Sequence, residues 1–135
     1  MPYSYTALLS LNALSSAYAI LGWSDGTKAV ALRFLPGASN SEIAEFSAFS
    51  SPTVTSVASS ITLPNPVWIK LSAGSSTIYW DYSADGVTWY PLYSQVATAY
   101  LTAATDVIFG IDNFNGGGTV FTTLMSWTQG TSVGP

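Results

Sequence analysis

The carboxylates are the residues of this chain that could carry out acid–base chemistry, and two of them lie close together in sequence. Glu42 and Glu45 are three positions apart in the segment Ser41-Glu42-Ile43-Ala44-Glu45-Phe46. Hydrolysis of a glycosidic bond needs two carboxylates facing one cleft, about 5–9.5 Å apart. On a regular strand, residues an odd number of positions apart face opposite sides of the sheet. The spacing therefore argues against a glycosidase, and we predict no catalytic residue and no enzyme.

Other site chemistries are limited by two missing residue types, since the chain has no His and no Cys. An ordinary Ser-His-Asp triad, a thiolate nucleophile and a His- or Cys-ligated metal are therefore excluded. Asp112, Asn113 and Asn115 share a Gly-rich segment, with Asp106 close in sequence. Such oxygen ligands suit calcium, which typically takes about 6–8 of them. Turn chemistry explains these residues equally well, so we predict no metal site and leave calcium open as an alternative.

Aromatic residues are the better candidates for ligand binding. Sugar recognition combines a flat aromatic face, which stacks on C–H surfaces, with a few polar groups for the hydroxyls. Trp23 lies beside an Asp-Gly turn, and Tyr79 and Asp81 alternate with apolar residues in one predicted strand. We predict a glycan-binding role for Trp23, Tyr79, Asp81 and Asn113.

The elements that position these residues read as short strands separated by turns. Asp25-Gly26 separates the apolar runs 18–23 and 28–34, and Asp85-Gly86 separates 77–83 from 88–93. Glycine accepts the positive φ that tight hairpin turns require. We therefore expect both Asp-Gly pairs to set turn geometry rather than to bind a ligand.

Within 77–83, strict alternation predicts that Ile78, Trp80 and Tyr82 face one way and Tyr79 and Asp81 the other. One face of each sheet must pack against the other sheet. Most tryptophans are therefore expected in the core, namely Trp68, Trp80, Trp89 and Trp127.

Further strands are predicted over 67–71, 107–111 and 119–127, with a loop between the last two. The segment 5–11 is ambiguous, because its Ala and Leu residues have near-helical spacing and favour helix. Its β surroundings lead us to predict a strand. No linker divides the sequence. We predict one domain over 1–135, an all-β, two-sheet antiparallel sandwich of the jelly-roll type.

The chain resembles the concanavalin A-like (laminin-G-like) jelly-roll domains of bacteriophage structural proteins. The resemblance is carried by three consecutive segments, which are Trp68-Ile69-Lys70-Leu71, Ile78-Tyr79-Trp80-Asp81-Tyr82-Ser83 and Asp85-Gly86-Val87-Thr88-Trp89. It extends from about Tyr18 to the closing strand. These motifs are specific for the fold and not for a function, since such sandwiches occur in lectins, glycosidase accessory domains and virion proteins.

The chain departs from that family at its beginning. Family members usually have further strands before the equivalent of Tyr3-Ser4-Tyr5. We expect either a shorter sheet edge here or an edge completed by a preceding segment or a neighbouring subunit. An uncovered edge strand would invite association.

Composition restricts the partners. Only 7% of the residues are charged, against about 25% in typical soluble domains. The net charge is −4, and the cations are Lys28, Arg33 and Lys70. Nucleic acids require a basic groove and anionic membrane surfaces a basic cluster, so neither partner is expected. No run of apolar residues reaches membrane-spanning length.

The resemblance implies a non-enzymatic phage virion module, on a tail fibre, spike or capsid surface, that contacts host glycans. This places it in an extracellular particle, with other virion proteins or its own copies as partners; a homotrimer is plausible. The alternative is a carbohydrate-binding accessory domain of a larger bacterial glycoside hydrolase.

Overall fold

The computed structural model describes residues 3–13, 17–35, 41–48, 52–59, 62–112 and 120–131. Within these ranges the chain forms ten strands and one short 3-10 helix, η1 (Ala97–Ala99). The strands are β1 (Tyr3–Ala13), β2 (Tyr18–Ser24), β3 (Lys28–Phe34), β4 (Ser41–Ser47), β5 (Pro52–Ser59), β6 (Val67–Ala73), β7 (Thr77–Ser83), β8 (Tyr90–Val96), β9 (Asp106–Asp112) and β10 (Val120–Gly130). None of the described helical residues forms a segment long and apolar enough to cross a membrane.

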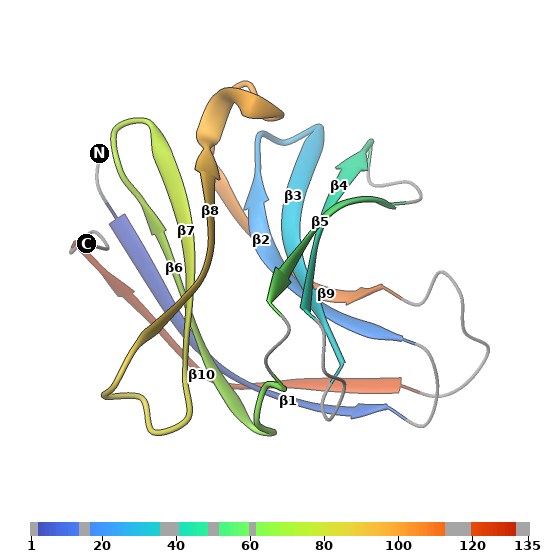
Figure 1. Ribbon diagram of the computed structural model, residues 1–135, viewed down its shortest axis with the longest axis vertical. Helices are drawn as coiled ribbons and strands as arrows, with labels where there is room; N and C mark the ends of the chain where they lie inside the picture. The colour runs from blue at the N-terminus through green and yellow to red at the C-terminus, as the bar shows by residue number, and fades with distance from the viewer. Residues whose placement is uncertain are drawn as a thin grey trace.

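The strands form two antiparallel sheets that pack face to face (Figure 1). The first sheet has the order β10-β1-β6-β7-β8 and the second the order β5-β4-β3-β2-β9. This architecture confirms the predicted all-β, two-sheet sandwich. The strands predicted from the sequence did not include β5, and β4 was considered only as the strand that would carry Glu42 and Glu45, because Ser and Ala residues and a Pro hide the alternation that marks a strand.

The core lies between the sheets and is built by alternation along the strands. Ile78 and Trp80 of β7 are fully buried against Leu21 and Trp23 of β2 and their neighbours. The Trp80 indole N–H donates a hydrogen bond to the backbone carbonyl of Leu21, 3.1 Å away. This bond joins the two sheets directly and satisfies a buried polar group.

The ambiguous N-terminal segment is a strand, as predicted, but it does not form an edge. β1 pairs with β6 on one side and with β10 on the other. We had expected a shorter sheet edge here, or an edge completed by a preceding segment or a neighbouring subunit, but β1 is covered on its second side by β10 of the same chain. The local pattern could not show this, because the covering strand β10 comes from the far end of the chain.

Asn65 extends the pairing of β1 beyond the start of β6. Its neighbours Pro64 and Pro66 have no backbone N–H to donate. The Asn65 side-chain amide donates to the Leu11 carbonyl at 2.9 Å and accepts from the Leu11 N–H at 3.2 Å. One side chain thus replaces a strand residue where two prolines prevent normal pairing.

Both Asp-Gly pairs form turns, as expected. Gly26 and Gly86 have φ of 87° and 75°, in the region that favours glycine. The Asp85 carboxylate accepts hydrogen bonds from the backbone N–H groups of Val87 and Thr88, both at 2.8 Å. Asp25 is bonded in the same way by its own turn. Thr102, from outside this turn, also donates its backbone N–H to Asp25 at 2.9 Å and lowers the pKa of that carboxyl most. Backbone donors thus hold the pKa of both carboxyls far below the ordinary range.

Candidate functional site

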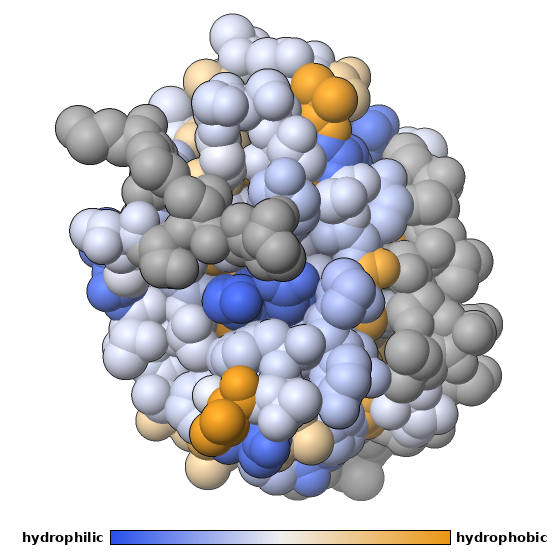
Figure 2. Space-filling model, turned by 60° about the vertical axis from the view of Figure 1, so that its left-hand side comes forward, coloured by the Kyte–Doolittle hydropathy of each residue, from blue (hydrophilic) through white to orange (hydrophobic). Residues whose placement is uncertain are grey.

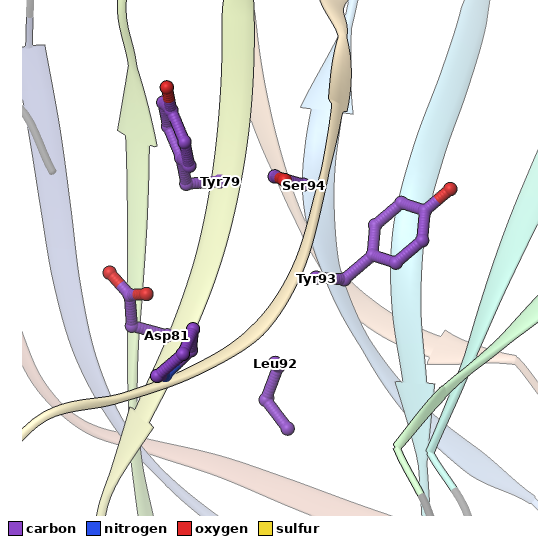
Figure 3. A pocket seen from close by; sticks show the side chains of 6 residues that line it. Tyr79, Asp81, Leu92, Tyr93 and Ser94 are labelled. Carbon is purple, nitrogen blue, oxygen red and sulfur yellow. The ribbon is translucent and has the colours of Figure 1, made fainter. Parts of the chain in front are cut away.

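The candidate site is a hollow of about 540 Å³ along the last two strands of the first sheet. Its lining comes from β7 and β8 and consists of Tyr79, Asp81, Pro91, Leu92, Tyr93 and Ser94. Tyr79 and Asp81 are two positions apart, so they lie on the same side of β7, opposite the buried Ile78 and Trp80. Figure 3 shows these two side chains on one side of β7, with Ser94 pointing the same way and Tyr93 pointing away. The structure therefore brings together two of the four residues predicted to bind a glycan.

An irregularity in strand pairing shapes the hollow. Trp80 pairs with Tyr93, but the next residue, Asp81, pairs with Pro91, so that β8 contains one extra residue at this point. The extra residue, Leu92, is buried and joins the core. Pro91 is tolerated because β8 is an edge strand. Bulges of this kind re-aim side chains and are common beside functional sites.

Asp81 is the charged residue of the hollow, and it is only 6% exposed. The Lys70 ammonium on β6 lies 3.4 Å from Asp81 Oδ2. Burial raises the pKa of Asp81, and Lys70 partly offsets this rise by favouring the carboxylate. A sheltered carboxylate of this kind gains by accepting hydrogen bonds from ligand hydroxyls, since its own burial is costly.

Two tryptophans lie on the same outer side of the sheet as Lys70. The Lys70 ammonium lies 4.8 Å from the centre of the Trp89 ring. Trp68, from the same strand as Lys70, packs against Gly86 so closely that a β-carbon there would lie 3.0 Å from the indole. The turn after β7 therefore folds onto the outer side of the sheet, where Gly86 contacts Trp68 and Trp89 contacts Lys70.

The wider face is neutral. Figure 2 brings forward the side of the molecule that carries β6 and β7 in Figure 1, and most of this surface has intermediate hydropathy. Strongly hydrophilic and strongly hydrophobic spots are small and scattered there. Such a surface suits contact with uncharged polar molecules better than with phosphates or lipid tails.

Lys70, Trp89 and Ser94 were not recognised from the sequence as parts of this region. The position of Lys70 could have been predicted from the turn between the strands 67–71 and 77–83. In the structure Gly74 to Thr77 form this four-residue turn, closed by a 2.8 Å backbone hydrogen bond. Counting outward from that turn places Lys70 opposite Asp81. No comparable signal marked Ser94, since the bulge that sets its register cannot be read from local pattern.

Trp23 does not belong to a ligand site, which corrects the prediction. Its side chain is fully buried and lies against the rings of Tyr3 and Tyr5, at 5.5 and 6.0 Å between centres. The residue precedes a turn, but alternation along β2 directs it inward. A ring with no exposed surface cannot stack on a sugar. Asn113, the fourth predicted residue, lies outside the described residues.

The expected core tryptophans divide into three groups. Trp80 is fully buried, which confirms the prediction, whereas Trp68 and Trp89 are half-buried on the outer side of the first sheet. Trp127 is 39% exposed, so the prediction was wrong for this residue. It lies on β10, at the margin of the sheet, where the opposite sheet does not cover it completely.

The acidic residues outside the hollow do not converge. Glu42 pairs with Arg33 at 3.4 Å, on the side of β4 opposite to Glu45, as strand spacing predicted. Asp106 and Asp112 begin and end β9, and Asp112 is bound to Arg33 at 2.9 Å. Sequence proximity therefore does not bring Asp106 and Asp112 into one calcium site, and Asn115, like Asn113, is outside the described residues. All seven acidic residues are described, and no three of them group as metal ligands.

Comparison with known proteins supports the fold. No protein-family model and no curated protein matches the chain. A solved structure of a mutant of the GH43 protein BlXynB from Bacillus licheniformis is similar over 97% of this chain, with a TM-score of 0.68 and 12% identity. A functionally unknown protein from Saccharomyces cerevisiae is similar over 98% of this chain, with a TM-score of 0.59 and 12% identity. This chain spans 28% of the bacterial protein and 71% of the yeast protein.

Proposed function

We propose that this domain is a non-catalytic carbohydrate-binding module, and that the hollow beside Tyr79 and Asp81 is its saccharide site. The observation that carries the proposal is the pairing of an aromatic ring with a sheltered carboxylate on one face of β7. An aromatic ring offers a surface for sugar C–H groups, and the carboxylate and Ser94 offer hydrogen bonds to hydroxyls.

The similarity to the GH43 protein supports this assignment over the alternatives. GH43 proteins are glycoside hydrolases, and this chain corresponds in length to 28% of that one. A domain of this size within a larger hydrolase fits the role of an accessory module that holds the enzyme to its substrate. The hollow contains one carboxylate, whereas glycoside hydrolysis uses two.

The expectation of a phage virion module has no support among these comparisons and stays a prediction. The same holds for placement in an extracellular particle and for a homotrimer. Both functions use a rigid sandwich for display, so sugar binding alone does not separate them. The neighbouring coding sequence does, since a hydrolase domain on the same chain would identify an accessory module.

The proposal is tested by screening the domain against neutral oligosaccharides on a glycan array and measuring the best ligand by calorimetry. Tyr79→Ala should weaken binding at least about tenfold, because it removes the ring face on which the sugar C–H groups would stack. Tyr90→Ala is the matched control, because Tyr90 is an exposed tyrosine on the neighbouring edge strand β8 but does not line the hollow. A silent array, or equal losses in both variants, would refute the assignment.

A further inference from the structure

A second feature lies at the opposite margin of the first sheet, four strands away from β8. β10 forms that margin and pairs only with β1 in the described part of the chain. Figure 1 shows β10 running along the outside of its sheet. An edge strand presents unpaired N–H and C=O groups, which form a template for another strand unless the edge is protected.

The three other edges carry recognised protection. β8 contains Pro91, β5 begins with Pro52 and pairs irregularly with β4, and β9 is short and carries Asp106 and Asp112 at its ends. Proline, bulges, short length and charge are the devices that keep edges from pairing.

β10 has fewer of these devices. It has 11 residues and contains no proline and no charged residue, and the same is true of its neighbour β1. Its one irregularity is a bulge opposite Leu8 and Leu9, which leaves Met125 56% exposed. Leu124 and Trp127 are each 39% exposed on the same strand. The longest and least protected edge therefore also carries three exposed large hydrophobic residues.

We infer that β10 pairs with β10 of a second copy of this chain, in an antiparallel arrangement around a two-fold axis. Two identical antiparallel strands present the same groups to each other, so one self-complementary edge suffices. The charges that give the chain its net −4 all lie outside β1 and β10, so two copies meet there without facing charge. A charged partner is less suitable, because neither β10 nor β1 has a charged side chain with which it could form an ion pair.

The size of the contact determines its strength. An 11-residue strand is about 36 Å long, so edge pairing of two strands about 10 Å wide buries roughly 700 Å² in total. Stable interfaces bury about 1,200 Å² or more. The dimer is therefore a weak one, which forms at high protein concentration and dissociates on dilution.

The β10–β10 pairing is independent of the proposed saccharide binding, but it would affect how tightly a repeating saccharide is held. Because β10 and β8 are opposite margins of one sheet, a β10-paired dimer leaves the hollow open in each copy. Two linked sites would bind a repeating ligand more tightly than one site, without any new contact.

Light scattering coupled to gel filtration tests the inference across a concentration series. The mass should rise from 14.2 kDa toward twice that value as concentration increases. Thr128→Lys adds a charge to β10 and should keep the mass at 14.2 kDa throughout. Thr53→Lys is the matched control, since it makes the same charge change at an exposed position of the β5 edge, and it should associate like the unmodified chain.

A second measurement covers the case in which Thr128→Lys does not fold. The chain has no cysteine, so Met125→Cys places a single exposed thiol at the middle of β10, and Thr53→Cys places one on β5. A bifunctional maleimide should give covalent dimers of the first variant and not of the second. A wild-type mass of 14.2 kDa at every concentration, or equal cross-linking of both variants, would overturn the inference that β10 mediates self-association.

Discussion

Gly22 lies where the neighbouring strand leaves no room for a β-carbon, so replacing it with alanine is a sharp test of the fold. Gly22 lies on β2 and pairs with Ala31 on β3. A β-carbon built at this position would lie 2.7 Å from the Ala31 β-carbon and would overlap the Val30 carbonyl oxygen. Carbon atoms pack favourably at about 3.5–4.0 Å. The overlap therefore approaches 1 Å, and most of it is with backbone.

The loss of folding stability in Gly22→Ala depends on how far β2 can shift to relieve the overlap. β2 is held between β3 and β9, so the strand cannot shift away from Ala31 without disturbing a second ladder. Inserting a methyl group into a packed core typically costs about 1–3 kcal/mol. Because the atoms met here belong mainly to the backbone, we expect about 3 kcal/mol or more for Gly22→Ala. The lower entropy of the unfolded chain returns only about 0.4–1 kcal/mol.

Gly110→Ala provides the control on the neighbouring strand. The nearest atom to a β-carbon at Gly110 is a carbon of Ile20 at 3.8 Å, which is ordinary contact. This variant should be neutral or more stable by up to about 1 kcal/mol. Urea unfolding followed by tryptophan fluorescence gives both values. If Gly22→Ala lost less than about 1 kcal/mol, comparable with ordinary surface changes, the close pairing of β2 and β3 described here would be incorrect.

Two further predictions concern the turns and the sheet margin. The pKa of Asp25 and Asp85 is lower in the folded than in the unfolded chain, so their stabilisation is complete above about pH 4 and is lost as the pH falls through the folded values. The raised pKa of Asp81 acts in the opposite direction and favours folding at low pH. The urea concentration at the midpoint of unfolding should therefore decrease when the pH is lowered below about 4. Asp85→Asn, which keeps an acceptor oxygen, should make this decrease smaller, and an unchanged pH profile in that variant would contradict the prediction. Asn65→Ala removes both hydrogen bonds to the Leu11 backbone and should cost about 1–2 kcal/mol, with faster exchange of the Leu11 amide; unchanged exchange would show that this pairing is absent in solution.

The comparison of sequence and structure separates what is local from what is not. Alternation along 77–83 correctly placed Trp80 inward and Tyr79 and Asp81 together on the other side. Trp23 was misplaced because its position beside a turn suggested exposure, while the same alternation rule directs it into the core. Pairing between distant segments was beyond local pattern, which is why β10 beside β1 was not foreseen.

The placement of the three cations strengthens the case for a neutral ligand. Lys28, Arg33 and Lys70 lie over the rings of Tyr100, Tyr18 and Trp89, at 5.0, 4.1 and 4.8 Å. Each also contacts an oxygen of the protein, namely the Tyr100 carbonyl for Lys28 and carboxylates for the other two. A cation held in this way would have to give up existing partners to bind a phosphate, and binding to nucleic acid depends on many Lys and Arg contacts with phosphates, which release the counterions of the nucleic acid. The chain has no other Lys or Arg, so we expect the proposed recognition to depend on aromatic faces, hydroxyls and the Asp81 carboxylate, which are groups that suit an uncharged sugar.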